Sequence, residues 1–139
     1  MIKKLLLLSV LIITVFMVSS CSREEKSLIL FNHNPITRLN VLENATDFKV
    51  DERIYFIYMT KKNLEGEDIR IKIFKREPKA NGLMNTLVYS NDFRLKKGEI
   101  NYFTDYIVMQ KSGDYAMLVF RKDNLWRADA IADFRVNSR

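Results

Sequence analysis

The sequence predicts an all-β domain, because apolar and polar residues alternate along it and turn-forming segments divide it into short runs. In DIRIKIFK (68–75), Ile69, Ile71 and Ile73 share one face and are separated by charged residues. LWRADAIADFRV (125–136) alternates in the same way. Its predicted core face consists of Trp126, Ala128, Ala130, Ala132, Phe134 and Val136, and its predicted solvent face of Arg127, Asp129, Asp133 and Arg135. Both segments are therefore expected to form half-buried strands.

Two further runs are apolar at nearly every position and rich in aromatic and β-branched residues. They are ERIYFIYMT (52–60) and DYAMLVFR (114–121), and this composition predicts central strands covered on both faces. The predicted turns between strands are NLEGED (63–68), PKANG (78–82), SND (90–92), KKGE (96–99), KSGD (111–114) and KDN (122–124), the last a tight hairpin. A short strand is expected at 86–89. The spacing predicts an antiparallel β-sandwich of about seven or eight strands, with a small up-and-down β-barrel as the alternative.

One segment indicates a particular kind of sandwich. KSGDYAM (111–117) resembles the entry to strand F of immunoglobulin-like domains, where a Gly precedes a Tyr and a core residue follows two positions later. This resemblance implies that Tyr115 forms a tyrosine corner and that Met117 stands where antibody domains place a cysteine. FRV (134–136) is similar to the end of the last strand in bacterial immunoglobulin-like domains, many of which also lack the cysteine pair and early tryptophan that are missing here.

The N-terminus has the plan of a secretory signal peptide, with two lysines before an apolar run at 5–18 that is short for a membrane span of about 20 residues. The sequence Val18, Ser19, Ser20, Cys21 resembles the lipobox of bacterial lipoproteins. That resemblance implies that the Cys21 thiol is diacylglycerylated and that signal peptidase II cuts just before it. Acyl chains such as palmitate would then hold the mature protein on a membrane.

The chain is expected to divide into a cleaved signal peptide (1–20), a lipidated stem (21–35) and a β-sandwich domain (36–139), with 27–31 as a candidate first edge strand inside the stem. The mature protein is expected in a bacterial cell envelope. Ser22 stands where many inner-membrane lipoproteins of Gram-negative bacteria carry aspartate, so the family's rule favours the outer membrane if the envelope is Gram-negative. His33, between two asparagines, is expected to lie in a turn.

Composition and motifs give no sign of an enzyme. The 139 residues carry a net charge of +6 without a block of five like charges, so nucleic acid is not an expected partner. Histidine and cysteine each occur once, which excludes a conventional catalytic triad built on the domain, an intrachain disulfide and a cysteine-based zinc site. We therefore expect no catalytic residue, no metal and no cofactor.

The function expected from these features is that of a non-enzymatic binding or assembly module. It would be tethered to the membrane by its lipid and would contact an envelope protein or polymer through an edge strand or a loop. The alternatives are an inhibitor that protects the envelope from a hydrolase, acting through 62–68 or 78–86, and a carrier of small apolar ligands. The residues expected in binding loops are Glu65, Glu67, Asp68, Lys79 and Asn81.

Overall fold

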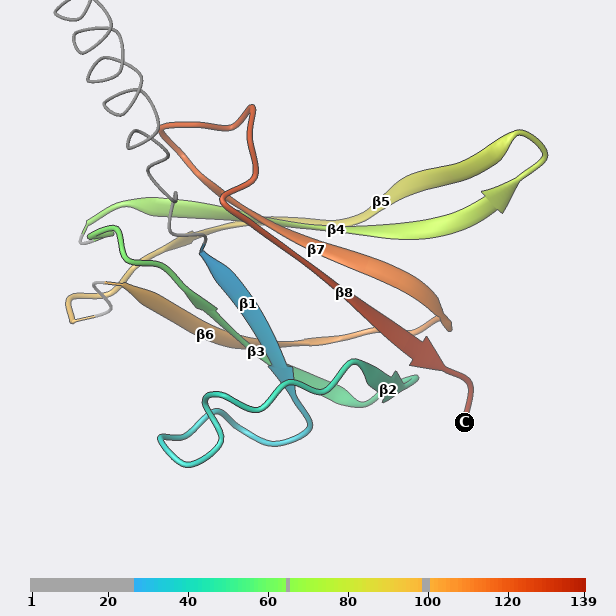
Figure 1. Cartoon of the computed structure of the whole chain (residues 1–139), viewed down its shortest axis with the longest axis horizontal. Helices are drawn as coiled ribbons and strands as arrows, with labels where there is room; N and C mark the ends of the chain where they lie inside the picture. Colours follow the sequence, from blue (N-terminus) through green and yellow to red (C-terminus); the bar gives the residue numbers. More distant parts are fainter. Residues whose placement is uncertain (1–26, 65, 99–100) are drawn as a thin grey trace, which may run out of the picture.

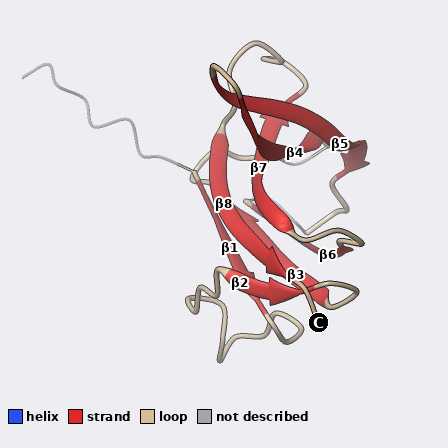
Figure 2. Cartoon of the chain, turned by 90° about the vertical axis from the view of Figure 1, so that its right-hand side faces the viewer, coloured by secondary structure: helices blue, strands red, loops and turns tan. Residues whose placement is uncertain are grey.

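The computed structural model describes residues 27–64, 66–98 and 101–139, which form strands joined by loops and turns (Figures 1 and 2). The strands are β1 (Leu28–Asn32), β2 (Asp47–Lys49), β3 (Arg53–Met59), β4 (Asp68–Lys79), β5 (Gly82–Arg94), β6 (Tyr102–Val108), β7 (Gly113–Arg121) and β8 (Ala130–Asn137). Within these ranges there is no helix of the length and apolarity that a membrane crossing requires. The predicted all-β class and the predicted number of strands are confirmed.

The strands form two sheets, with the orders β1-β3-β6 and β2-β8-β7-β4-β5. Because the two ladders stay separate, the domain is a sandwich and not the alternative closed barrel. The order is that of the immunoglobulin fold: β1, β3 and β6 correspond to strands A, B and E, and β4, β5, β7 and β8 to C, C′, F and G.

One pairing departs from the predicted antiparallel arrangement. β2 runs parallel to β8, with Phe48 opposite Val136. The chain reaches this sheet through the long connection after β1 instead of through a tight hairpin, and only a tight hairpin would impose an antiparallel neighbour. In Figure 2, β2 lies beside the end of β8, near the C-terminus.

Inward-facing side chains of both sheets fill the space between them. In β4 the predicted alternation is complete, since Ile69, Ile71 and Ile73 are fully buried. They belong to one apolar cluster with Phe56 and Tyr58 of β3. Burial of each large apolar side chain contributes about 1.5–3 kcal/mol relative to leaving it exposed.

β3 and β7 lie in the middle of their sheets, as the two apolar runs predicted. In β7, Met117 and Val119 face the core, while Ala116 and Phe120 are also buried on the opposite face. Lys72 of β4 covers that outer face, with its Nζ 5.4 Å from the centre of the Phe120 ring. Both faces of β7 are therefore shielded from water.

Tyr115 lies at the start of β7 and is almost completely buried. Its Oη donates a hydrogen bond of 2.7 Å to the backbone oxygen of Lys111, four residues upstream, which is the contact of a tyrosine corner. Its ring stacks on Phe134 of β8 at a centroid distance of 5.4 Å. Burial raises the pKa of the Tyr115 phenol.

β5 is much longer than the strand predicted at 86–89, and the predicted turn at 90–92 is wrong. Those three residues continue the ladder with β4, where Asp92 lies opposite Arg70. The Arg70 Nε donates to Asp92 Oδ1 at 2.7 Å across the two strands. A run of turn-forming residues thus remains a strand, because cross-strand pairing outweighs weak local propensity.

The start of β8 also differs from the prediction. The chain turns at 122–123, but β8 begins only at Ala130, so Trp126 and Ala128 lie in a loop and not in the core. The backbone N–H groups of Trp126 and Arg127 both approach the side-chain oxygen of Asn124 at 3.3 Å, which bends the chain away from the ladder. Asp129, predicted on the solvent face, instead has a side chain only 12% exposed.

The folded domain begins earlier than residue 36. β1 lies inside the predicted stem (21–35), and its side chains Ile29 and Phe31 are buried in the core. The sandwich therefore starts at Leu28, because β1 is needed to cover one edge of β3. The predicted signal peptide (1–20) and the lipobox residues Val18, Ser19, Ser20 and Cys21 lie outside the described residues.

Candidate functional site

The predicted acidic binding loop at 65–68 is tied to the body of the domain. Arg121, at the end of β7, donates to both carboxylate oxygens of Glu67 at 2.9–3.1 Å. Lys122 Nζ lies 3.2 Å from Asp68 Oδ2. Leu64, in the same connection, is fully buried. Glu67 and Asp68 therefore act in structural ion pairs, and Glu65 lies outside the described residues.

Lys79 and Asn81 lie instead at the tip of the hairpin between β4 and β5, where both are exposed. Ala80 and Asn81 form the turn, and Gly82 follows with a φ of +127°, a conformation that side chains with a Cβ rarely adopt. The structure thus separates the two pairs of predicted binding residues. One pair supports the base of β4, and the other caps the far end of the same hairpin.

The end of this hairpin extends beyond the rest of its sheet. The last pairing of β4 with β7 joins Arg76 to Asp114, whereas β4 and β5 remain paired as far as Lys79 and Gly82. Residues 77–84, which we call the arm, are therefore a two-stranded ribbon to which no other described segment adds a third strand. Figure 1 shows the arm at the far right of the molecule.

β5 forms an outer edge of the five-stranded sheet, since β4 is its only neighbour among the strands that the structure describes. The stretch from Gly82 to Asn91 contains no charged residue. Its large apolar side chains are well exposed: Leu83 71%, Met84 39%, Leu87 49% and Val88 44%. Soluble proteins usually protect such an edge with charges or proline, so this one is available for pairing.

The register shows how these apolar side chains are arranged. Leu83 lies opposite Pro78 and Leu87 opposite Phe74, and these pairs share one face because their positions differ by four along each strand. The ladder shifts register between Ile73 and Phe74, next to Val88. The irregularity does not remove the edge, since pairing with β4 continues on both sides of it. The result is an uncharged stretch of β5 (82–91) with an apolar stripe beside its unpaired backbone.

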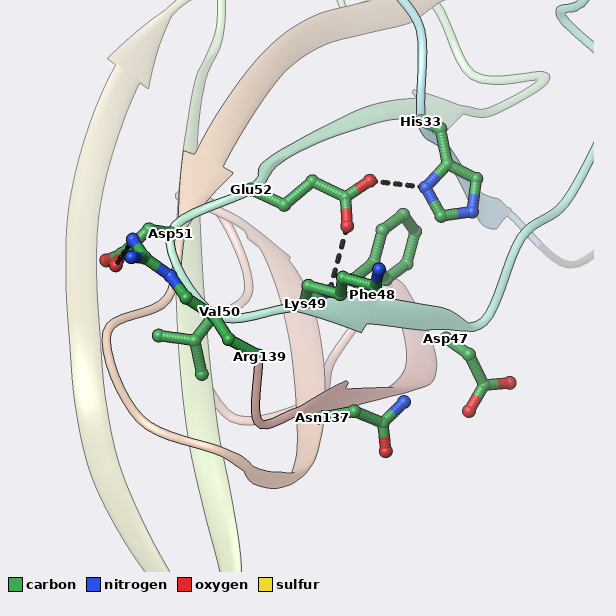
Figure 3. A pocket seen from close by; sticks show the side chains of 9 residues that line it. All are labelled: His33, Asp47, Phe48, Lys49, Val50, Asp51, Glu52, Asn137 and Arg139. Atoms are coloured by element: carbon green, nitrogen blue, oxygen red, sulfur yellow. Dashed lines mark hydrogen bonds and ion pairs between the residues drawn. The ribbon is translucent and has the colours of Figure 1, made fainter.

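A surface hollow lies between the segment after β1 and the turn after β2 (Figure 3). His33 Nδ1 is hydrogen-bonded to Glu52 Oε1, and the backbone N–H of Lys49 donates to the other oxygen of Glu52 at 2.8 Å. Burial raises the pKa of the Glu52 carboxyl, but the bonds from His33 and Lys49 outweigh it, so the pKa lies below its ordinary value. None of the nine lining residues carries a hydroxyl or thiol.

A second polar group, missed by the sequence analysis, lies at the other end of the domain. The carboxylate of Asp129 accepts hydrogen bonds of 2.5 Å from Ser27 Oγ and Tyr58 Oη, and lies 3.1 Å from Lys62 Nζ. We call these four residues the Asp129 cluster. Burial raises the pKa of Asp129, but the three donors together outweigh burial and lower it. Burial, followed by the bond to Asp129, raises the pKa of Tyr58.

The Asp129 cluster joins three separate parts of the chain. Ser27 immediately precedes β1, Tyr58 belongs to β3, and Asp129 immediately precedes β8. It therefore fixes the entry of the chain into the sandwich against the β7–β8 loop. No local signal in the sequence could have revealed it, because Ser27 and Asp129 are 102 residues apart. Among the described residues, no group of three histidine, cysteine or acidic side chains is placed to hold a metal.

Neither known protein families nor curated protein sequences match this chain. Several solved structures are similar in shape. A superoxide reductase (neelaredoxin) from Ignicoccus hospitalis is 13% identical with a TM-score of 0.45, and the match covers 88% of each chain. A beta-glucosidase from Listeria innocua, in complex with gluconolactone, is 11% identical with a TM-score of 0.40, over 80% of this chain and 16% of that one.

A third similar structure is a conjugative transposon lipoprotein from Bacteroides eggerthii. It is 12% identical with a TM-score of 0.39, and the match covers 81% of this chain and 98% of that one. At these low identities and TM-scores the three likenesses carry no argument about function. The function is therefore argued from the residues of this chain alone.

Proposed function

We propose that this chain is a lipid-anchored protein of a bacterial cell envelope and a non-enzymatic binding module. Cys21 would hold it on the membrane, and β5 would pair with an extended segment of another envelope protein. The anchor rests on the resemblance of residues 18–21 to a lipobox. The observation that carries the binding function is the exposed, uncharged edge from Gly82 to Asn91.

The physical basis is β-strand addition. An edge strand presents backbone N–H and C=O groups that a partner strand can satisfy, and contacts between side chains then determine which partner fits. On β5, Leu83 and Leu87 supply the apolar contacts beside that backbone. A protein suits this edge better than a polysaccharide, because a polysaccharide offers no matching ladder of amide groups.

Cross-linking in intact envelopes tests this function. A photoreactive amino acid at Leu83 should give a discrete adduct with one envelope protein. The matched control is the same amino acid at Leu39, which is 96% exposed in the connection between β1 and β2 and does not belong to the edge. An adduct from Leu83 and none from Leu39 would support binding through β5.

A charged residue placed on the edge provides a second test. Leu87→Lys places an ammonium group in the apolar stripe and should weaken the Leu83 adduct roughly tenfold. Leu39→Lys, with the same chemical change, should leave it intact. Equal adducts from both positions, or none above a lipid-anchored control lacking the domain, would contradict the proposal.

The exposed arm also supports a second candidate function, that of an inhibitor, because a projecting hairpin can enter the cleft of an enzyme. Leu83, at 71% exposure, lies beside its tip. An inhibitor should reduce the activity of a lysozyme or protease at a stoichiometric ratio, and that reduction should be lost on Leu83→Lys. Full enzyme activity at excess protein would contradict this second function for the enzyme tested.

A further inference from the structure

We propose that the β7–β8 loop (122–129) inserts Trp126 into the interface of the bilayer that holds Cys21. The inference rests on the proposed lipid anchor and adds a second, non-covalent contact with the same membrane. It would give the domain a defined orientation, with one end on the lipid surface.

Trp126 is 98% exposed, and its neighbour Leu125 is 41% exposed. The loop that carries them is ordered by its own hydrogen bonds. Asn124 N–H donates to the Arg121 oxygen at 3.0 Å, and the Asn124 side chain accepts from the backbone of Trp126 and Arg127. The turn therefore holds the indole outward. Covering this indole and the neighbouring leucine with an apolar phase removes their surface from water, which is favourable.

The loop lies at the point where the chain enters the sandwich. Asp129, three residues after Trp126, accepts a hydrogen bond of 2.5 Å from Ser27. Ser27 is six residues after Cys21, so the backbone between them spans at most about 20 Å. A bilayer that holds the acyl chains of Cys21 must therefore lie close to this end of the domain. Figure 1 shows the loop beside the start of β1.

Two other connections lie at the same end. Leu95 N–H donates to the Glu67 oxygen at 3.3 Å, and Lys122 N–H to the Asp68 oxygen at 3.2 Å, which brings the β3–β4 and β5–β6 connections beside the loop. Together, 61–68, 94–99 and 121–129 contain eight basic and six acidic residues, a net charge of +2. The net positive charge of these stretches of sequence is compatible with anionic lipid headgroups, while the apolar contact supplies most of the attraction.

Tryptophan suits the boundary between water and hydrocarbon. Its ring is large and apolar, and its Nε1–H can still donate to a headgroup or to water, so it is enriched at membrane interfaces. Leu125 beside it would add apolar area to the same contact. The arm at 77–84 lies at the opposite end of the hairpin from the β3–β4 connection, and so lies far from the loop that carries Trp126 (Figure 1).

Trp126 is the only tryptophan in the chain, so its fluorescence reports on this loop alone. The test uses the mature lipidated protein, reconstituted on vesicles of phosphatidylethanolamine and phosphatidylglycerol and purified by flotation. We expect the emission to shift to shorter wavelength, acrylamide quenching to decrease, and lipids brominated near the headgroup to quench the signal. Leu125→Asp should reverse all three effects, whereas Leu39→Asp, the same change in a different loop, should not.

The outcomes separate this inference from the proposed function. Protein that fails to float with the vesicles would contradict the lipid anchor. Protein that floats while Trp126 keeps the emission and acrylamide quenching of a water-exposed indole would overturn the inference and leave the anchor intact. Shielding of Trp126 that appears only after envelope proteins are added would also overturn it, because the loop would then bind a protein and not lipid.

Discussion

At the scale of single residues, Asp129 shows how a side chain with ordinary sequence surroundings acquires a particular role. Its carboxylate receives donors from Ser27, Tyr58 and Lys62, and it is only 12% exposed. Because these donors lower its pKa despite burial, Asp129 is a stabilising anion in the folded protein. This same carboxylate connects the start of the fold, through Ser27, to the β7–β8 loop.

Replacement of Asp129 by asparagine should therefore destabilise the domain in a pH-dependent way. Since the pKa is lower folded than unfolded, the stabilisation is present above about pH 4 and is lost as the pH falls through the folded value. At pH 7 we expect Asp129→Asn to reduce the free energy of unfolding by about 1–3 kcal/mol. Urea denaturation at pH 7 and at lower pH measures this, and the difference between the proteins should shrink in acid.

Asp133→Asn is the matched control. Asp133 pairs with Arg76 at 2.8 Å, but its side chain is 62% exposed, so the substitution should change stability by less than about 1 kcal/mol. An Asp129→Asn protein as stable as the unmodified chain at pH 7 would show that the cluster contributes nothing. A difference that persists unchanged in acid would show that the charge of Asp129 is not the cause.

At the scale of elements, β4 and β5 combine a rigid part with an exposed one. Ile69 to Phe74 of β4 are paired with β5 on one side and with β7 on the other. The arm at 77–84 has only its own two strands, and an isolated hairpin is at best marginally stable in water. One strand thus carries both a core segment and a candidate binding segment.

This difference predicts uneven hydrogen exchange along β4. Backbone amides in 77–84 should exchange roughly a hundredfold faster or more than those in 69–74, because local opening of the arm does not require opening of the core. Exchange followed by mass spectrometry on peptides from the two segments measures it. Equal protection would indicate that the arm is covered, as it would be if two copies of the chain paired through β5. Repeating the measurement at tenfold dilution distinguishes that case.

At the scale of the whole molecule, function depends on where the sandwich is held. The β7–β8 loop lies at one end, beside the start of β1, and the arm extends at the other (Figure 1). A lipid anchor with two or three acyl chains holds a protein durably, whereas one chain or one loop gives only weak binding. Attachment should therefore require Cys21, with Trp126 contributing orientation.

Cys21→Ala should abolish both lipid incorporation and membrane attachment, since the chain has no other thiol. Labelled palmitate and fractionation of the envelope measure the two effects in the producing bacterium. The matched control is Ser22→Ala, which changes the adjacent residue and should keep the lipid. A Cys21→Ala protein that still sediments with membranes would instead indicate that residues 1–20 remain as an uncleaved anchor.

Much of the fold follows from local sequence. The alternation at Ile69, Ile71 and Ile73 predicted the buried face of β4, and the apolar runs predicted the two central strands. The Gly-x-Tyr pattern before Tyr115 indicated an immunoglobulin-like sandwich, whose strand order the structure shows. These predictions succeed because which face of a strand is buried is encoded by residues two positions apart.

The errors lie where distant pairing decides the outcome. The turn-forming residues at 90–92 remain in β5 because Arg70 and the rest of β4 pair with them. Trp126 continued the alternation of β8 in the sequence, yet the turn at Asn124 and the attachment of Asp129 remove it from the strand. Glu67, expected in a binding loop, is held by Arg121, 54 residues away.

The sequence by itself determined that this chain is an all-β sandwich, and it predicts a lipid anchor at Cys21, since both depend on short local patterns. Only the tertiary structure decided that β5 is a long edge strand, that Asp129 joins Ser27 to Tyr58, and that Trp126 faces outward. Each of these depends on contacts between segments far apart in the chain. Contacts of this kind produce no periodic pattern and no motif in the sequence. Tertiary packing, and not the adjacent residues, determines which segments meet.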